Sequence, residues 1–117
     1  MDMKSILLDL LRPCSVANRY AGYAQLLRAV EIVLEDLDAI QAMSKQVYHV
    51  IAKEYNMLPK SVESNLGTLS NAAWNRNPAS LIEIAGYPLD DKPTAAELIE
   101  IFSGYVQRKY MMEMAYN

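Results

Sequence analysis

The chain has 117 residues, of which 52% are hydrophobic and 21% are charged, and its formal net charge is −3 at pH 7. These values predict one folded domain with a sizeable core over residues 1–117, and they exclude a disordered chain. The negative net charge argues against a protein that coats nucleic acid non-specifically, but it is compatible with a local basic face. The single cysteine, Cys14, excludes an internal disulfide framework and fits a reducing, cytoplasmic location. No apolar run approaches the roughly 20 residues that span a bilayer, so no membrane association is expected.

Two amphipathic helices are predicted in the first third of the chain. Residues 3–12 form a short helix that Pro13 ends, and its inward residues are Ile6, Leu7, Leu10 and Leu11. An exposed interaction face of Leu7, Leu8 and Leu11 is the alternative. Residues 20–40 form the longest predicted helix, with an apolar stripe of Leu26, Leu27, Val30, Val33, Leu34 and Leu37. Its four clustered carboxylates lie on this one element, which favours a solvated acidic face over a metal site: Glu31, Glu35, Asp36 and Asp38.

Residues 44–76 predict two short helices joined by a tight turn. Ser44 is the expected N-cap of the first helix, whose apolar positions are Val47, Val50, Ile51 and Tyr55. Pro59 suits the first turn of the second helix, whose apolar positions are Val62, Leu66, Leu69 and Ala73. This is the helix-turn-helix pattern, although a plain antiparallel helix pair has the same periodicity.

The second of these helices, over about residues 59–74, has a small, polar outward face. Helical spacing places six residues on it: Lys60, Ser64, Gly67, Thr68, Asn71 and Asn75. Gly67 lowers helix stability by about 1 kcal/mol relative to alanine, so it either permits the close approach of a partner or is simply tolerated. Trp74 is expected to anchor the end of the helix. The only histidine, His49, is expected on the flank of the preceding helix, as a surface residue or a phosphate contact.

The C-terminal third predicts two more helices. Asn77 and Pro78 break the chain, and a short helix over 81–84 ends at Gly86. After a loop over 87–93, Thr94 and Glu97 form a capping box. The last helix then runs to about Met112, with Leu98, Ile101, Phe102 and Tyr105 inward. Its end is rich in side chains that suit an interface, although a packed or frayed tail is the simpler interpretation: Tyr110, Met111, Met112, Met114 and Tyr116.

The patterns that signal catalysis are absent from the sequence. It has no Cys/His cluster with zinc spacing, no glycine-rich phosphate loop, and no arguable Ser-His-Asp or Cys-His arrangement. No enzymatic activity, metal or cofactor is therefore expected.

Short groups of residues between Tyr20 and Tyr105 match a known family in order and spacing, apart from a gap before Lys92. They are Gly22-Tyr23, Leu27-Arg28-Ala29, Val47-Tyr48, Ile51-Ala52-Lys53, Asn56, Val62-Glu63, Ala73-Trp74, Arg76, Gly86-Tyr87, Lys92-Pro93-Thr94 and Glu97. On these residues the chain resembles the C-terminal effector domain of the sporulation-initiating response regulator, stage zero sporulation protein A. The resemblance implies an all-helical bundle of about six helices, whose third and fourth helices form a helix-turn-helix. It also implies that the fourth helix enters the major groove, and that the domain controls transcription by tandem or dimeric binding to DNA.

The chain departs from the family in the residues that would face DNA. Family members carry arginines and a following histidine along the recognition helix, where this chain has Ser61, Ser64, Gly67 and Thr68, and only Glu63 persists. The loop before the last helix is shorter and holds Asp90 and Asp91, with Lys92 remaining. The family's usual protein also has an N-terminal receiver domain, so the chain is expected to be either an excised domain or a relative without a receiver.

Two hypotheses follow. In the first, the chain is a DNA-binding transcriptional regulator domain whose recognition face comprises Lys60, Ser61, Glu63, Ser64, Gly67, Thr68 and Asn71. Its phosphate contacts come from Lys45, Lys53, Arg76 and Lys92. Asn65, Asn71 and Asn75 are candidate adenine readers, with ordinary surface positions as the simpler interpretation. In the second, a degenerate helix-turn-helix acts as a protein-interaction or dimerisation module, pairing with itself or a related regulator through the tyrosine- and methionine-rich tail.

Overall fold

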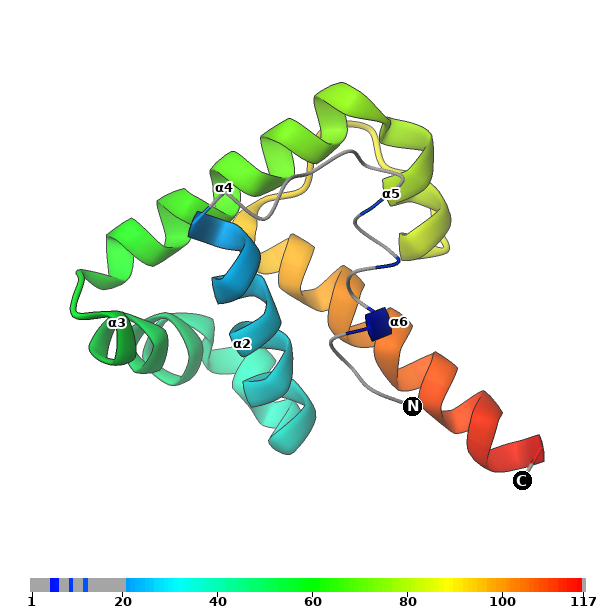
Figure 1. Ribbon diagram of the computed structural model, residues 1–117, viewed down its shortest axis with the longest axis horizontal. Coiled ribbons are helices and arrows are strands. Elements are labelled where there is room, and N and C mark those ends of the chain that lie inside the picture. The colour runs from blue at the N-terminus through cyan, green and yellow to red at the C-terminus, as the bar shows by residue number, and fades with distance from the viewer. Residues whose placement is uncertain (1–4, 7–8, 10–11, 13–20, 117) are drawn as a thin grey trace.

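The computed structural model describes residues 5–6, 9, 12 and 21–116, and every regular element in these residues is helical (Figure 1). In chain order they are α2 (Ala21–Glu35), η1 (Leu37–Ala42), η2 (Met43–Tyr48), α3 (His49–Tyr55), α4 (Pro59–Arg76), α5 (Pro78–Ala85) and α6 (Ala95–Tyr116). The predicted all-α bundle with a helix-turn-helix is confirmed. The helix predicted over residues 3–12 lies mostly outside the described residues, as do Leu7, Leu8, Leu10 and Leu11. Of its predicted inward residues Ile6 is described, and it is buried.

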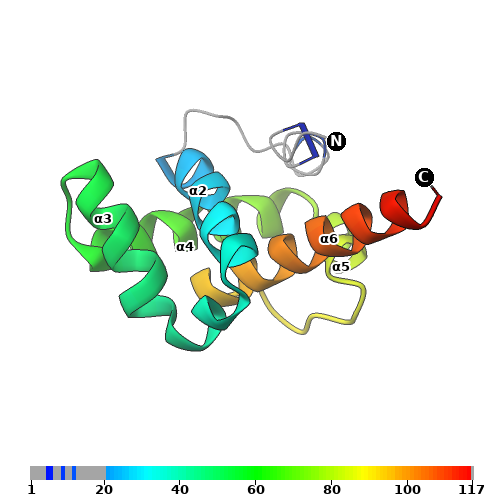
Figure 2. The same ribbon diagram turned by 90° about the horizontal axis from the view of Figure 1, so that it is seen from below.

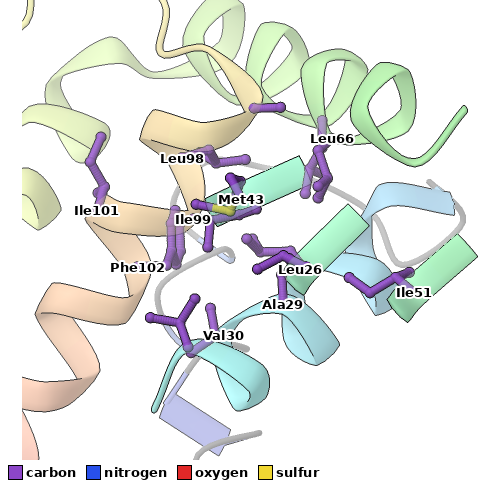
Figure 3. Close-up of a cluster of buried hydrophobic side chains, with 14 of the residues drawn as sticks. Leu26, Ala29, Val30, Met43, Ile51, Leu66, Leu98, Ile99, Ile101 and Phe102 are labelled. Carbon is purple, nitrogen blue, oxygen red and sulfur yellow. The ribbon is translucent and has the colours of Figure 1, made fainter. Parts of the chain in front are cut away.

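Helix α4 crosses the upper part of the molecule in Figure 1, with α2 and α6 beneath it and α3 and α5 at its two ends. The turned view shows the same arrangement from below, with the last turns of α6 projecting beyond the other labelled helices (Figure 2). The most extensive contact is between α2 and α4, and α6 packs against both. Figure 3 shows where they meet: Leu26 of α2, Leu66 of α4, and Leu98 and Phe102 of α6 are all fully buried. Together with the other buried hydrophobic side chains of the core, they supply the main driving force for this arrangement.

Gly22 allows α2 to lie very close to α4. A Cβ atom built at this position would lie 2.4 Å from the backbone oxygen of Asn65 and 3.1 Å from the Cβ of Leu69. Backbone atoms in a helix cannot move aside as a side chain can, so a larger residue has to push the helices apart. Gly22, the first residue of the Gly22-Tyr23 pair, is therefore needed for the close packing of α2 against α4.

The long helix predicted over 20–40 is wrong in its last part. Helix α2 ends at Glu35, because Asp36 adopts an extended conformation and its side chain accepts a hydrogen bond from the backbone N–H of Asp38. This cap starts the 3₁₀-helix η1, and it leaves Leu37 49% exposed instead of continuing the apolar stripe. The acidic residues from Glu31 to Asp38 are exposed, as expected for a solvated face. Among the described helices the longest is α6.

The helix boundaries in the C-terminal third follow local rules. Asn77 ends α4 and begins α5, where its side chain accepts a hydrogen bond from the N–H of Ser80. Gly86 ends α5 in the left-handed region, at φ 79°. The capping box is confirmed, since the Thr94 N–H donates to Glu97 Oε1 at 3.0 Å and the Glu97 N–H donates to Thr94 Oγ1 at 3.2 Å. Helix α6 continues to Tyr116, about one turn past the predicted end.

Candidate nucleic-acid interface

The first helix of the predicted pair starts differently from the expectation. Ser44 is not an N-cap, because it lies inside η2, a π-helix that continues directly from η1 and so has no free helix start at this residue. Its carbonyl oxygen accepts hydrogen bonds from the backbone N–H of His49 and from the Nδ1 of the same imidazole at 2.7 Å. A carbonyl only accepts, so this imidazole carries a proton on Nδ1. His49 is exposed on the flank of α3, where it was predicted.

The apolar stripe of α3 also differs from the predicted one. Val47 and Ile51 are fully buried as expected, whereas Val50 and Tyr55 are exposed. Tyr48 and Ala52 take the inward positions beside them. Val50 and Ala52 flank Ile51 in α3, and the structure buries the Ala52 side and exposes the Val50 side. Tyr55 is the last residue of α3, next to the turn at Asn56.

The turn between α3 and α4 has the geometry of a helix-turn-helix. Asn56 ends α3 in the left-handed region at φ 55°, which asparagine tolerates better than most residues. The Met57 N–H then donates to the Ala52 carbonyl at 2.9 Å. Leu58 is extended, with ψ 147°, and Pro59 begins α4 at its first position. The chain therefore reverses within three residues and presents α4 beside α3.

The inner face of α4 is buried where the sequence predicts it, at Val62, Leu66, Leu69 and Ala73. Trp74 is partly buried against the same core, in keeping with an anchoring role. One polar residue, Ser70, is also fully buried, and its hydroxyl donates to the Pro93 carbonyl at 2.6 Å. This bond fixes the loop that precedes α6 against the back of α4.

Asn65 is partly buried, and its side chain is engaged within the fold, unlike the exposed adenine-reader candidates Asn71 and Asn75. Its amide Nδ2 donates to the Oε1 of the buried Gln25 at 3.2 Å and lies 3.9 Å from the sulfur of Met57. Gln25 Nε2 also donates to that sulfur at 3.5 Å. The three side chains join α2, the turn and α4, and this use of Asn65 follows from the close approach of α2 at Gly22.

The outward face of α4 is open. Lys60, Glu63, Ser64, Thr68 and Asn71 are exposed, while Ser61 and Gly67 are partly buried. A Cβ at Gly67 would meet no heavy atom within 4 Å beyond its own helix. Gly67 therefore does not serve packing between the described elements, and the space above it is available to a partner.

Residues 7–106 match the family described as Sporulation initiation factor Spo0A C terminal. The chain belongs to this family. A Spo0A C-terminal domain is the DNA-binding, transcription-regulating domain of a sporulation-initiation factor. The helix-turn-helix of α3 and α4 is therefore the candidate DNA-contacting part of this chain. No helix among the described residues is both long and apolar enough to cross a membrane.

The phosphate candidates of this Spo0A-type domain are all exposed: Lys45, Lys53, Arg76 and Lys92. Lys92 is already engaged, because its Nζ donates to the Oδ1 of Asn71 at 3.1 Å. The hydrogen bond thus joins Lys92, a predicted phosphate contact, to Asn71, a predicted residue of the recognition face. No local sequence pattern predicts this contact, because the two residues are 21 positions apart.

The acidic side chains of α3 and α4 in this Spo0A-type domain, Glu54 and Glu63, have different surroundings. Arg28 of α2 binds Glu54 of α3 through two hydrogen bonds of 2.9 Å, Nε to Oε1 and Nη2 to Oε2. These bonds hold the pKa of the Glu54 carboxyl below its ordinary value. Burial raises the pKa of Tyr48 to about 12, with a further contribution from the Glu63 carboxylate. Glu63 itself is exposed on α4, one turn from Lys60.

Proposed function

We propose that the chain binds duplex DNA through the outward face of α4 and regulates transcription in this way. The observation that carries the proposal is that Lys60, Ser64 and Thr68 are exposed on the second helix of a helix-turn-helix. In such domains the second helix lies in the major groove while the first crosses the backbone. Membership of the Spo0A C-terminal family supports the same use of α4.

Polar side chains dominate the proposed recognition face. Ser64 and Thr68 carry hydroxyls that can contact base edges or phosphates, and Thr68 Oγ1 donates to the Ser64 carbonyl at 3.0 Å in the unbound protein. Asn71 contributes with its partner Lys92, whose ammonium has three protons and can bind a phosphate while keeping the amide contact. Ser61, Glu63 and Gly67 complete the face.

Charge limits the affinity that this face can provide. Between Ser44 and Arg76 there are four cations, and Glu54 and Glu63 are the acidic side chains that oppose them. The Glu54 charge is bound to Arg28. A small positive excess on an acidic protein favours binding that is measurable at low salt and weak at high salt.

Charge reversal on this face is expected to abolish most of that binding. A duplex is first obtained by in-vitro selection from random DNA, and affinity is then measured at several salt concentrations. If Lys45, Lys53, Arg76 and Lys92 each meet a phosphate, log K should fall against log salt with a slope of about −3.6. The double variant Lys53→Glu and Lys60→Glu should lower the affinity at least tenfold, on the order of one bidentate contact.

The matched control for this experiment is Lys109→Glu, which reverses an exposed charge on α6 away from α4. It should leave both the affinity and the salt slope nearly unchanged. Enrichment of no duplex at low salt would contradict the proposal, as would equal losses in the control and in the double variant.

A second candidate function is protein interaction through the end of α6. Met111 and Met112 are 63% and 59% exposed on turns that project from the bundle (Figure 2), and methionine adapts well to varied partner surfaces. The side chains of Tyr110, Met114 and Tyr116 lie outside the described part. We propose pairing with a second copy or a related regulator as the alternative use of the domain.

Truncation after Lys109 tests this alternative without cutting the described core, whose last buried residue is Val106. If the tail mediates association, the truncated chain should be monomeric by sizing in solution, while the chain with Lys53→Glu and Lys60→Glu should still associate. An association that the charge reversals remove and the truncation leaves intact would assign the contact to the α4 face instead.

A further inference from the structure

We infer that Leu58 reads the 5-methyl group of a thymine in the major groove, and that a thymine is therefore a preferred base of the site that this domain selects. This inference rests on the proposed DNA binding and names one feature of the bound sequence. It concerns a residue outside the polar recognition face described above.

Leu58 is the most exposed of the large hydrophobic residues described, at 71%. It occupies the N-cap position of α4 and makes no side-chain capping bond. A Ser, Thr, Asp or Asn at an N-cap would satisfy a free backbone N–H of the first turn, which leucine cannot do. An exposed leucine also gains nothing from the hydrophobic effect. Neither helix capping nor core packing among the described residues explains a leucine here.

The position of Leu58 is that of a base-contacting residue. The turn between α3 and α4 lies at one extremity of the molecule in both views (Figures 1 and 2), so a duplex can reach it without meeting α5 or α6. In helix-turn-helix proteins, the residues at the N-terminus of the second helix are the ones that contact base edges. Lys60, two residues further on, is exposed and can hold the adjacent backbone.

The chemistry of leucine selects the base. Its side chain has no hydrogen-bonding group, so it can discriminate only through an apolar surface. On the major-groove edges of the four base pairs, that surface is the C5 methyl group of thymine. Such a contact also suits a helix whose outward face has Lys60 as its single cation before Arg76, because it adds affinity without adding charge.

Replacing thymine by deoxyuridine isolates this contact, because it removes the methyl group and keeps every hydrogen-bonding group of the pair. In the selected duplex, each thymine is replaced in turn and the affinity of the unaltered protein is measured. At one position per bound domain the affinity should fall by about fourfold, the effect of one buried methyl group. With Leu58→Ala, the thymine and deoxyuridine duplexes should bind equally at that position.

Two further variants control the comparison. Leu37→Ala truncates another exposed leucine, on η1 at the far end of α2, and should keep the fourfold difference. Leu58→Met keeps an apolar side chain at the N-cap and should preserve most of it. Since Leu58 is largely exposed, its truncation should leave the melting temperature unchanged. If Leu58→Ala does not fold, Leu58→Ser provides the test, because its hydroxyl can cap α4 and it has no apolar surface for a methyl group.

The outcomes separate this inference from the proposed function. If no thymine is sensitive to the replacement, or if Leu58→Ala keeps the sensitivity of the unaltered protein, Leu58 does not read a methyl group, although the domain still binds DNA. If no duplex is bound at any salt concentration, both proposals fail.

Discussion

Replacing Ser64 and Gly67 together by arginine is expected to raise the affinity for duplex DNA between about tenfold and a thousandfold. The resemblance described above implies arginines along this side of the helix, where this chain has a serine and a glycine. Ser64 is exposed, and a side chain at Gly67 would enter open space, so both arginines can extend without disturbing the fold. Each would supply a phosphate contact or a bidentate contact to guanine.

The measurement is a titration of labelled duplex at fixed salt, followed by a new selection with the variant. The selected site should gain guanines relative to that of the unaltered chain. The matched control adds the same charge elsewhere, with Gln41→Arg on η1 and Gln107→Arg on α6, both exposed. If the control pair raises the affinity as much as the α4 pair, the effect is one of net charge, and α4 has no special role in binding.

The substitution Gly22→Ala should destabilise the protein by about 1–3 kcal/mol, as overpacking of a tight contact does. The added Cβ would lie 2.4 Å from the Asn65 backbone oxygen, so α2 and α4 have to separate. Separation also disturbs the hydrogen bond between Gln25 and Asn65 that lies beside the contact. Thermal and denaturant unfolding of the variant give the change in free energy.

Gly67→Ala is the natural counterpart, because it makes the same change on the open side of α4. There the alanine meets nothing within 4 Å, and the helix should gain about 1 kcal/mol from its higher propensity. The two glycines should thus respond with opposite signs. A Gly22→Ala variant as stable as Gly67→Ala would show that α2 and α4 are less closely packed than the structure has them.

What the sequence predicts well here is determined by local interactions. The capping box at Thr94 and Glu97, the break at Asn77, and the four buried positions of α4 all depend on spacings within one or two turns. A hydrophobic stripe or a cap is specified by neighbours in the chain, so pattern alone suffices.

What the sequence misses depends on contacts between distant segments. The inward turn of Asn65 requires Gln25 of α2 at hydrogen-bonding distance, and the engagement of Asn71 requires a loop that returns from α5. The π-helix of Met43–Tyr48 has no signature in composition, yet it takes the place of the helix start predicted at Ser44. The polar side chains of a candidate interface are the hardest to place, since a single partner elsewhere in the fold decides which way each one points.

The loop before α6 is attached to α4 at two successive residues, through the Ser70 bond to Pro93 and the Asn71 bond to Lys92. Its position relative to α4 is therefore established on folding, and in the proposed interface a nucleic acid that binds α4 would find Lys92 already in place. No chain entropy has to be lost to order the segment at the moment of association. If the proposed interface binds DNA, the distance between α4 and Lys92 determines which phosphate the lysine can reach, and lengthening the loop would move that point.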